Sequence, residues 1–195
     1  IGALPPHVTQ PSERENVIPL DNLAIDVGAR SAEEVAAMGI EVGDTAVLDT
    51  GFGRLAGSRV YGRAFDDRVA CAILLAVLEN VRDAELPWTL AACFSISEER
   101  QAVGIGPAAF AVRPDLAICL ETTTATDMPG VSEGNVVASL SKGPAITLAD
   151  KAVTVPSWLT RAIRELAQRE RIAFQVKRPL VGGTNAGTLE RTGPG

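Results

Sequence analysis

Three acidic clusters occupy the junctions between apolar segments of this chain, and they constrain its fold more than any other feature. They are Asp66-Asp67, Glu98-Glu99 and Glu121. The first opens a strongly apolar segment, and each of the others follows a short apolar run typical of a buried strand. In an open α/β sheet, ligands bind just beyond the carboxyl ends of the strands. Carboxylates gathered there repel one another unless a cation lies between them, so the clusters predict a metal site.

Composition and charge exclude several classes of protein. Of the 195 residues, 46% are hydrophobic, which is enough for a packed domain. The net charge of −6 argues against a nucleic-acid binder, which would normally carry a basic face. No apolar run reaches about 18 residues, the length that spans a bilayer, and residues 1–6 lack the pattern of a secretory leader. We therefore expect a cytoplasmic protein that binds neither nucleic acid nor membrane.

The cysteines favour a structural role. Cys71, Cys93 and Cys119 lie in apolar surroundings, their number is odd and no Cys-x-x-Cys pair occurs. Buried thiols are a better interpretation of this pattern than disulfides or metal ligands. Reduced thiols also agree with a cytoplasmic location.

Residues 1–60 predict part of a small β-rich domain. They contain short strand-like pieces, many turn residues and one helix. Ser31 begins a capping box that ends at Glu34, and Gly39 supplies the stop signal of this helix. Residues 42–48 then indicate a turn into a strand.

From residue 61 onward the sequence predicts a mixed, largely parallel α/β sheet flanked by helices. Residues 69–81 are apolar nearly all round, which is typical of a buried helix. Segments 88–97 and 116–120 have the composition of buried strands, and a short helix at 105–111 separates them. Strand, helix and strand in this order predict a right-handed parallel crossover.

The last third of the chain continues this rhythm. Residues 136–148 predict one or two strands, and an amphipathic helix capped by Ser157 is expected to end near Arg171. Residues 172–176 predict the next strand. The glycine-rich stretch 182–187 then predicts a turn into a final helix.

The acidic clusters also permit simpler interpretations. Asp66 or Asp67 could cap a helix, the Glu98-Glu99 pair could lie in a solvated loop, and Glu121 could be an ordinary polar strand end. Adjacent residues that leave a strand point in different directions. One glutamate of the pair could therefore bind a metal while the other acts as a general base. Any one cluster could occur by chance, but chance is a poor explanation of all three together.

Further motifs occur in a fixed order around these clusters. They are Gly62-Arg63-Ala64-Phe65-Asp66-Asp67-Arg68, Ser97-Glu98-Glu99, Leu120-Glu121-Thr122, Asp127-Met128-Pro129-Gly130, Lys142-Gly143-Pro144 and Gly182-Gly183-Thr184-Asn185-Ala186. In this order they resemble the M42 family of metallo-aminopeptidases, the glutamyl and tetrahedral aminopeptidase group. Residues 23–44 are similar to the inserted domain of that family, so the resemblance covers essentially the whole chain. It implies a zinc-peptidase-like fold.

The resemblance also implies roles for the acidic residues. Asp66 would bridge two divalent metals, zinc or cobalt, and a cis peptide would join it to Asp67, which would orient its neighbours. Glu98 would be the general base that activates the bridging water. Glu99 would bind one metal, and Glu121, where the family usually has Asp, would bind the other. The implied reaction removes N-terminal residues from peptides, and the implied assembly is a large homo-oligomer.

The chain also departs from the family pattern. The family site includes a His-x-Asp before these motifs and a His after the Gly-Gly-Thr motif, whereas the only histidine here is His7, for which a surface or structural role is expected. Asn185 stands where Asp is common. We therefore expect residues 61–195 to be a catalytic domain without its N-terminal strands and C-terminal end. Three carboxylates without imidazole would leave the metals under-coordinated, so weak or no zinc binding is expected of these residues alone.

Two alternatives to an aminopeptidase remain open. A non-catalytic relative could keep the fold for binding or assembly, because the ligand set is incomplete. A different metallohydrolase could act on acylated amino acids or sugars with the same carboxylates. A His-x-Asp upstream and a His downstream in the parent gene would favour the aminopeptidase over the non-catalytic relative.

Overall fold

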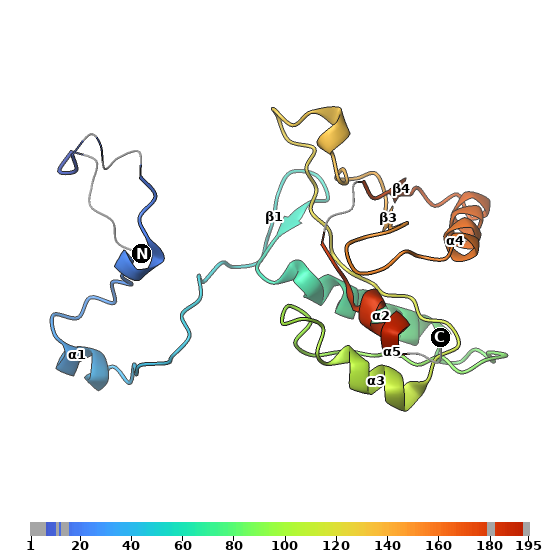
Figure 1. The fold of residues 1–195 in the computed structure, drawn as a ribbon, viewed down its shortest axis with the longest axis horizontal. Helices are drawn as coiled ribbons and strands as arrows, with labels where there is room; N and C mark the ends of the chain where they lie inside the picture. Colours follow the sequence, from blue (N-terminus) through green and yellow to red (C-terminus); the bar gives the residue numbers. More distant parts are fainter. Residues whose placement is uncertain (1–6, 11, 13–15, 179–181, 193–195) are drawn as a thin grey trace. The chain divides into compact units, whose positions relative to one another are not determined.

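The structure, a computed structural model, describes residues 7–10, 12, 16–178 and 182–192 (Figure 1). The chain divides into two units, Ile1–Thr50 and Gly51–Gly195. The division falls earlier than the boundary near residue 60 that the sequence suggested. None of the helices in the described ranges combines the length and the hydrophobicity that a bilayer crossing requires.

The first unit contains the helix that the capping box predicts. Helix α1 (Ala32–Ala37) follows Ser31, whose Oγ accepts a hydrogen bond from the backbone N–H of Glu34 at 3.3 Å. The Glu34 carboxylate accepts one from the N–H of Arg30 at 2.7 Å, and Gly39 ends the helix with a left-handed φ of +77°. A 3-10 turn, η2 (Leu20–Asn22), precedes it. Every described residue of this unit is at least partly exposed.

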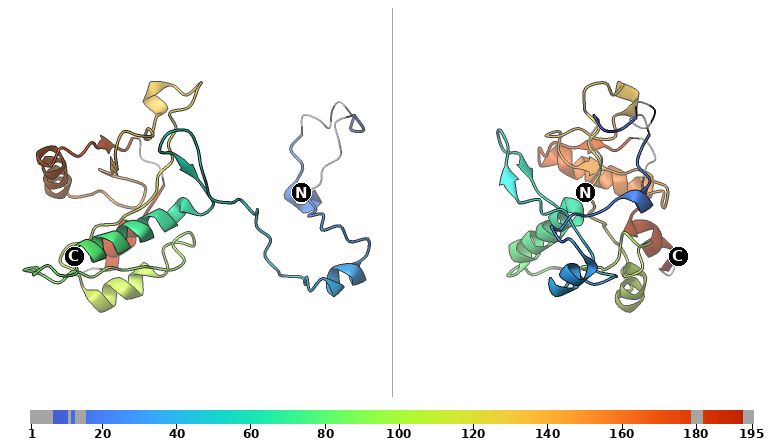
Figure 2. Two further views of the ribbon diagram at one scale, coloured as in Figure 1. Left: turned by 180° about the vertical axis from the view of Figure 1, so that it is seen from behind. Right: turned by 90° about the vertical axis from the view of Figure 1, so that its left-hand side faces the viewer.

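The second unit is built mainly from four helices. They are α2 (Phe65–Val81), α3 (Ile105–Val112), α4 (Ser157–Arg169) and α5 (Asn185–Thr192). Helices α3 and α5 pack against each other, as two views show (Figures 1 and 2). The sequence placed α3, α4 and α5 correctly, although Ser157 is the first residue of α4 and makes no capping hydrogen bond.

Two short sheets accompany these helices. Strands β1 (Gly53–Arg54) and β2 (Val60–Tyr61) pair antiparallel, with Gly53 opposite Tyr61. Strands β3 (Ala145–Ile146) and β4 (Gln175–Val176) pair in parallel, with α4 between them in sequence. The 3-10 turn η3 (Glu133–Asn135) precedes β3.

The Gln175 side chain fastens the strand β4 to the loop before β3. Its Oε1 accepts the N–H of Ser139 at 2.8 Å, and its Nε2 donates to the carbonyls of Ser139 and Gly143 at 3.0 and 2.8 Å. Three bonds from one partly buried side chain position a segment that lies more than thirty residues away in sequence. The parallel pair therefore does not depend on its two short strands alone.

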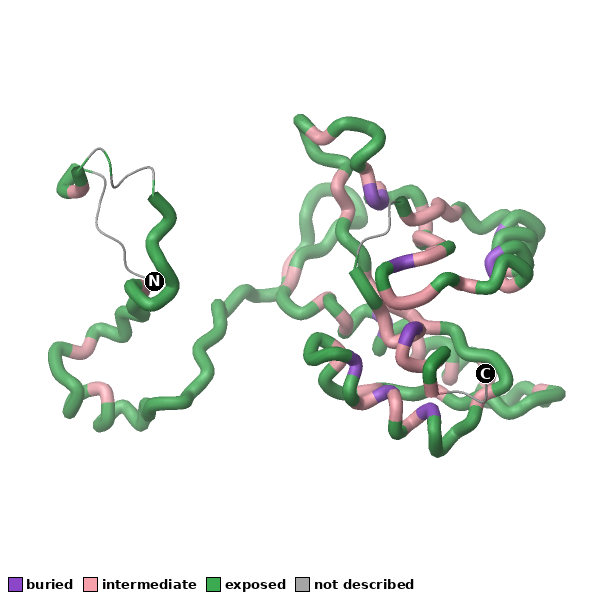
Figure 3. Tube along the Cα trace, viewed as in Figure 1, coloured by how far each residue is buried: buried purple, intermediate pink, exposed green. Residues whose placement is uncertain are grey.

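The buried core of the described residues is small and made mostly of small side chains (Figure 3). Its apolar members are Ala70, Ala102, Ile105, Ala109, Val137, Ala138 and Ala167. Asp150 and Thr160 are buried with them. No large side chain in the described ranges is fully buried, so close backbone approaches hold much of this unit together.

Two predictions about the centre of the second unit are wrong for this structure. Segments 88–97 and 116–120 were expected to form buried strands with a parallel crossover, but neither pairs with another strand among the described residues. Helix α2 was expected to be buried, yet only Ala70 is, and Leu75 is 59% exposed. A strand needs a neighbour for its backbone hydrogen bonds, and an apolar helix needs a covering surface. The described residues provide neither.

The expectation of buried thiols fails for the same reason. Cys71, on α2, and Cys93, in segment 88–97, are exposed, and only Cys119 is partly buried. All three are free. Burial raises the pKa of the Cys119 thiol to about 11, so this side chain stays protonated at neutral pH.

The glycine before β3 offers a test of this close-packed arrangement. Gly143 has a φ of +83°, and a Cβ on it would overlap the carbonyl oxygen of Ala173. Gly130 has a similar φ of +88° with nothing near its Cβ position. Gly130→Ala should lower the free energy of unfolding by about 1–2 kcal/mol, the left-handed penalty alone. Gly143→Ala should cost about 1–3 kcal/mol more, because it also overpacks the backbone. Urea unfolding followed by circular dichroism measures both, and equal losses would contradict the close approach.

Candidate metal centre

The first acidic cluster is presented by the irregular start of α2. The peptide bond between Asp66 and Asp67 is cis, as the resemblance implied, and both residues have non-helical φ and ψ angles. Asp67 Oδ1 accepts the N–H of Ala70 at 3.2 Å, which caps the regular part of the helix. The capping interpretation of this cluster is therefore correct for Asp67, and it leaves the Asp66 side chain without a capping role.

The Glu98-Glu99 pair lies on a tight turn between segment 88–97 and α3. Ser97 has a left-handed φ of +57°, and its carbonyl accepts the N–H groups of Arg100 and Val103 at 3.3 and 3.4 Å. The carbonyl of Glu98 accepts the N–H of Ala102 at 2.8 Å. These bonds close the turn on itself, so both glutamate side chains project from a compact segment.

Glu121 is partly buried and precedes a segment held by its own side chains. Thr126 Oγ1 accepts the N–H of Val137 at 2.8 Å, and Asp127 Oδ2 accepts the N–H of Leu140 at 3.0 Å. The chain is thus fixed shortly after Glu121, on its way to η3 and β3.

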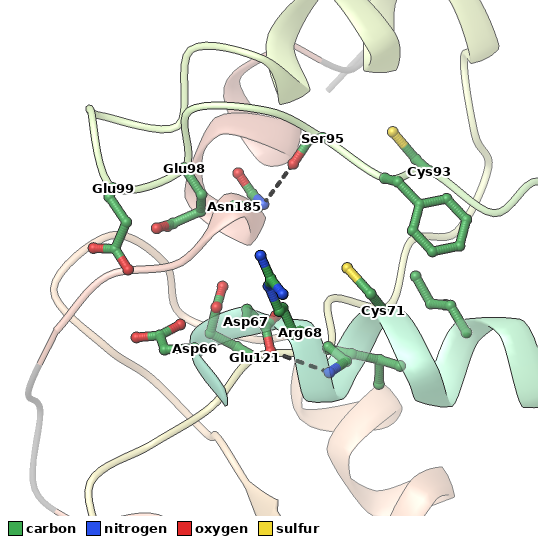
Figure 4. A pocket seen from close by; sticks show the side chains of 14 residues that line it. Asp66, Asp67, Arg68, Cys71, Cys93, Ser95, Glu98, Glu99, Glu121 and Asn185 are labelled. Atoms are coloured by element: carbon green, nitrogen blue, oxygen red, sulfur yellow. Dashed lines mark hydrogen bonds between the residues drawn. The ribbon is translucent and has the colours of Figure 1, made fainter. Parts of the chain in front are cut away.

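These three segments converge on one cavity of about 240 Å³ (Figure 4). All five carboxylates predicted for the site line it: Asp66, Asp67, Glu98, Glu99 and Glu121. Carboxylate oxygens of Asp66, Asp67 and Glu121 lie within 4.8 Å of one another. Glu98 and Glu99 face this group from the opposite side (Figure 4). The closest group therefore contains Asp67 rather than Glu99.

The crowding shifts the protonation of these carboxyls. Burial, with the neighbouring charges of Asp67, Glu98 and Asp66, raises the pKa of Glu121 to about 7. The side-chain interaction between Asp67 and Glu121 adds to the rise in the pKa of Glu121 and opposes the rise in that of Asp67. Burial and the charge of Asp66 raise the pKa of Asp67, against the opposing effect of its hydrogen bonds from Ala70 and Glu121.

The pKa of Glu98 is also raised. Burial contributes most, followed by the charges of Glu99, Asp66 and Asp67. The influence of both aspartates on Glu98 means that the two sides of the cavity interact electrostatically. A cation between them would relieve this repulsion.

The cavity also contains residues that the acidic pattern did not indicate. Arg68, Ser95 and Asn185 line it together with Cys71 and Cys93. Asn185 Nδ2 donates to Ser95 Oγ at 3.1 Å, across 90 residues of sequence. No local sequence signal relates these two residues, because only the folded chain brings them together.

The predicted glycine-rich turn places Asn185 at the cavity. Buried Asp150 accepts the N–H groups of Ala152 and Val153 through Oδ1, at 2.6 and 2.9 Å. Its Oδ2 accepts the hydroxyl of Thr184 at 3.3 Å. A Cβ on Gly187 would lie 2.6 Å from that of Ala152, so the start of α5 packs closely on the Asp150 loop.

The donor set of the cavity suits a divalent cation with a preference for oxygen. Carboxylate oxygens of Asp66, Asp67 and Glu121 are close enough to share an ion. Burial first, and the neighbouring charges after it, raise the pKa values of Asp67 and Glu121. None of the described residues that line the cavity carries an imidazole. His7 belongs to the other unit and is exposed, as expected.

The chain is similar to several known aminopeptidases. The putative aminopeptidase FrvX of Escherichia coli K12 is 30% identical over 195 residues, which are all of this chain and 54% of that protein. The crystal structure of a TET aminopeptidase from the marine sediment archaeon Thaumarchaeota archaeon SCGC AB-539-E09 superposes with a TM-score of 0.91 at 30% identity, over 98% of this chain and 54% of that one. The structure of PhTET1-12s, described as a dodecamer, has a TM-score of 0.75 at 28% identity, over 98% and 55%.

Two statements follow from these similarities. The chain has the mixed α/β fold of the TET aminopeptidases, and it spans about half the length of the relatives that it matches. The family match extends over residues 1–195, from the first unit through the carboxylate clusters to the glycine-rich turn. This chain therefore belongs to the M42 glutamyl aminopeptidase family.

Proposed function

We propose that residues 61–195 form part of the catalytic domain of a metal-dependent aminopeptidase that removes N-terminal residues from peptides. Residues 1–60 would belong to an inserted domain of the same protein. The convergence of five carboxylates on one cavity, in a member of the M42 family, is the observation that carries this proposal.

The charge of the cavity supports two divalent cations, of the zinc or cobalt class. Five carboxylates and the guanidinium of Arg68 line it, which leaves an excess of four negative charges when all are ionised. Asp66, Glu99 and Glu121 would hold the cations, with Asp66 shared between them. When bound, two such ions would polarise the scissile carbonyl and make water more acidic.

Glu98 would act as the general base. It faces the aspartates across the cavity, and burial with the surrounding charges raises its pKa toward the range suited to proton transfer. Its carboxylate would accept a proton from the attacking water as the water oxygen bonds to the scissile carbonyl carbon. The same proton would pass to the leaving amine when the carbon–nitrogen bond breaks.

Location and assembly complete the proposal. We place the protein in the cytoplasm and assign it a homo-oligomeric assembly, for which the dodecamer named for PhTET1-12s gives support. Because none of the described residues that line the cavity carries an imidazole, one alternative stays open. In it, the protein is a non-catalytic relative that retains the fold for binding or assembly. If the parent gene also encodes a His-x-Asp upstream and a His downstream, the aminopeptidase is favoured over the non-catalytic relative.

The first test separates the two glutamates in the full-length gene product. Glu98→Gln should keep its metal content and lose about 10²–10⁴-fold in kcat, because the base is removed while the ligands remain. Glu99→Gln should instead lose metal. Metal analysis and hydrolysis of aminoacyl-p-nitroanilides measure these effects, and Glu133→Gln, on exposed η3, is the control. The reverse pattern would show that the two roles are exchanged.

The second test compares the adjacent aspartates. Asp66→Ala should empty or disorder the whole site, since a shared ligand contacts both ions. Asp67→Asn keeps an oxygen that can cap Ala70 but loses the charge, and should cost about 10–100-fold in metal affinity or activity. Cobalt titrations of both variants provide the comparison. If Asp67→Asn emptied the site and Asp66→Ala did not, the shared ligand would be Asp67.

The third test uses pH. Without a cation the pKa of Glu121 is raised to about 7, so the folded protein holds a proton that the unfolded chain releases above its ordinary value of 4.5. Stability without metal should therefore fall as the pH rises through this window. At pH 6, where a cation-bound water keeps most of its protons, cation binding should release about one proton from Glu121. Calorimetry in buffers of different ionisation enthalpy counts this proton, and no release at pH 6 would contradict a raised pKa.

A further inference from the structure

The two glutamates of the cavity are positioned by their backbone alone. Within the described ranges, no hydrogen bond or ion pair holds the carboxylate of Glu98 or that of Glu99. Their location relative to Asp66 and Asp67 therefore depends on whatever fixes the turn that carries them. A catalytic group displaced by about 1 Å can lose about 10²-fold in rate, so this support matters for function.

The turn is closed on itself and packs closely on the residues before it. Hydrogen bonds from Arg100, Ala102 and Val103 close it, and a Cβ on Gly104 would overlap the backbone of Ile96. Ser95 immediately precedes this closed segment. A bond that fixes Ser95 therefore fixes Glu98 and Glu99 as well.

Asn185 provides such a bond from a well-anchored position. It begins α5, which packs on α3, and the residue before it is tied to buried Asp150 through the Thr184 hydroxyl. Its Nδ2 donates to Ser95 Oγ at 3.1 Å, and both residues line the cavity (Figure 4).

The other end of the Asn185 amide shows that packing alone does not explain this residue. Its Oδ1 is buried and has no hydrogen-bond partner among the described residues. An unsatisfied buried acceptor is costly, and an apolar side chain would fill the same space without that cost. In folded proteins, such exceptions call for an explanation, and a functional role is one of the established ones.

We propose that Asn185 is a positioning residue, which acts through Ser95 to hold the Glu98-Glu99 turn against the Asp66-Asp67 side of the cavity. The proposal rests on the function proposed above for Glu98 and Glu99. Asn185 acts on the reaction through the placement of these carboxylates and makes no contact with the reacting atoms.

A double-mutant cycle in the full-length gene product tests this coupling. Asn185→Ala and Ser95→Ala should each lower kcat about 10–100-fold, with KM changed less than about 3-fold. Each should also weaken the binding of Co²⁺ alone, because Glu99 moves. The double variant should be no worse than either single one, since both remove the same bond. Ser95→Thr keeps the hydroxyl, so its kcat and Co²⁺ affinity should be close to those of the wild type and well above those of Ser95→Ala.

The control removes a hydrogen bond from the same helix away from the cavity. Thr192 Oγ1 donates to the carbonyl of Thr188 at 2.8 Å, and Thr192→Val should leave kcat and Co²⁺ affinity unchanged. Additive losses in the double variant, or losses of kcat that Ser95→Thr does not restore, would overturn the proposal.

Two further outcomes separate this inference from the proposed function. If the wild-type product binds Co²⁺ but hydrolyses no peptide, the aminopeptidase proposal fails, and the cycle in Co²⁺ affinity still decides for or against the positioning role. If it binds no Co²⁺, amide hydrogen exchange decides. Loss of the Asn185–Ser95 bond should then speed exchange at Ala102 and Val103 and leave Arg113, bonded within α3, unchanged. Unchanged exchange at Ala102 and Val103 would overturn the proposal.

Discussion

Electrostatic repulsion among carboxylates in one cavity is the constraint on which the second unit depends. Each of the three acidic segments reaches the cavity in a different way: through the irregular start of α2, through a closed turn, and through a segment held by Thr126 and Asp127. Burial, together with this repulsion, raises the pKa of Glu121 to about 7. The fold thus keeps together groups that would separate if the chain were free to relax.

The interactions that hold the second unit together differ from those of a conventional α/β core. The described part of the second unit has few buried large side chains and only two-residue strands, yet single side chains make long-range links, such as Gln175 to Ser139 and Asn185 to Ser95. The apolar faces of α2 and of segment 88–97 are exposed. The chain spans about half the length of the relatives that it matches.

Sequence reasoning succeeded where the signal is local. The Ser31 capping box and the glycine-rich turn into α5 follow from spacing and residue type. The acidic clusters do line one cavity, although the parallel strands from which this was predicted do not form in the described residues. It failed for segments 88–97 and 116–120, because composition indicates what a segment could pair with and says nothing about whether a partner is present. The prediction of buried cysteines failed for the same reason, because composition does not reveal whether a covering surface is present. The role of Ser95 could not be predicted, because its partner is 90 residues away.

Asp67 shows how closely folding and chemistry are joined at this site. One of its oxygens accepts the N–H of Ala70 and so starts the regular part of α2, and its carboxylate also interacts with that of Glu121. The cap leaves Asp67 fewer free lone pairs than Asp66 has, which favours Asp66 as the shared ligand although both lie in the closest group. If a cation replaced the Glu121 proton, Asp67 would gain a charged neighbour beside the oxygen that caps α2. Occupancy of the proposed site would then be coupled to the start of this helix.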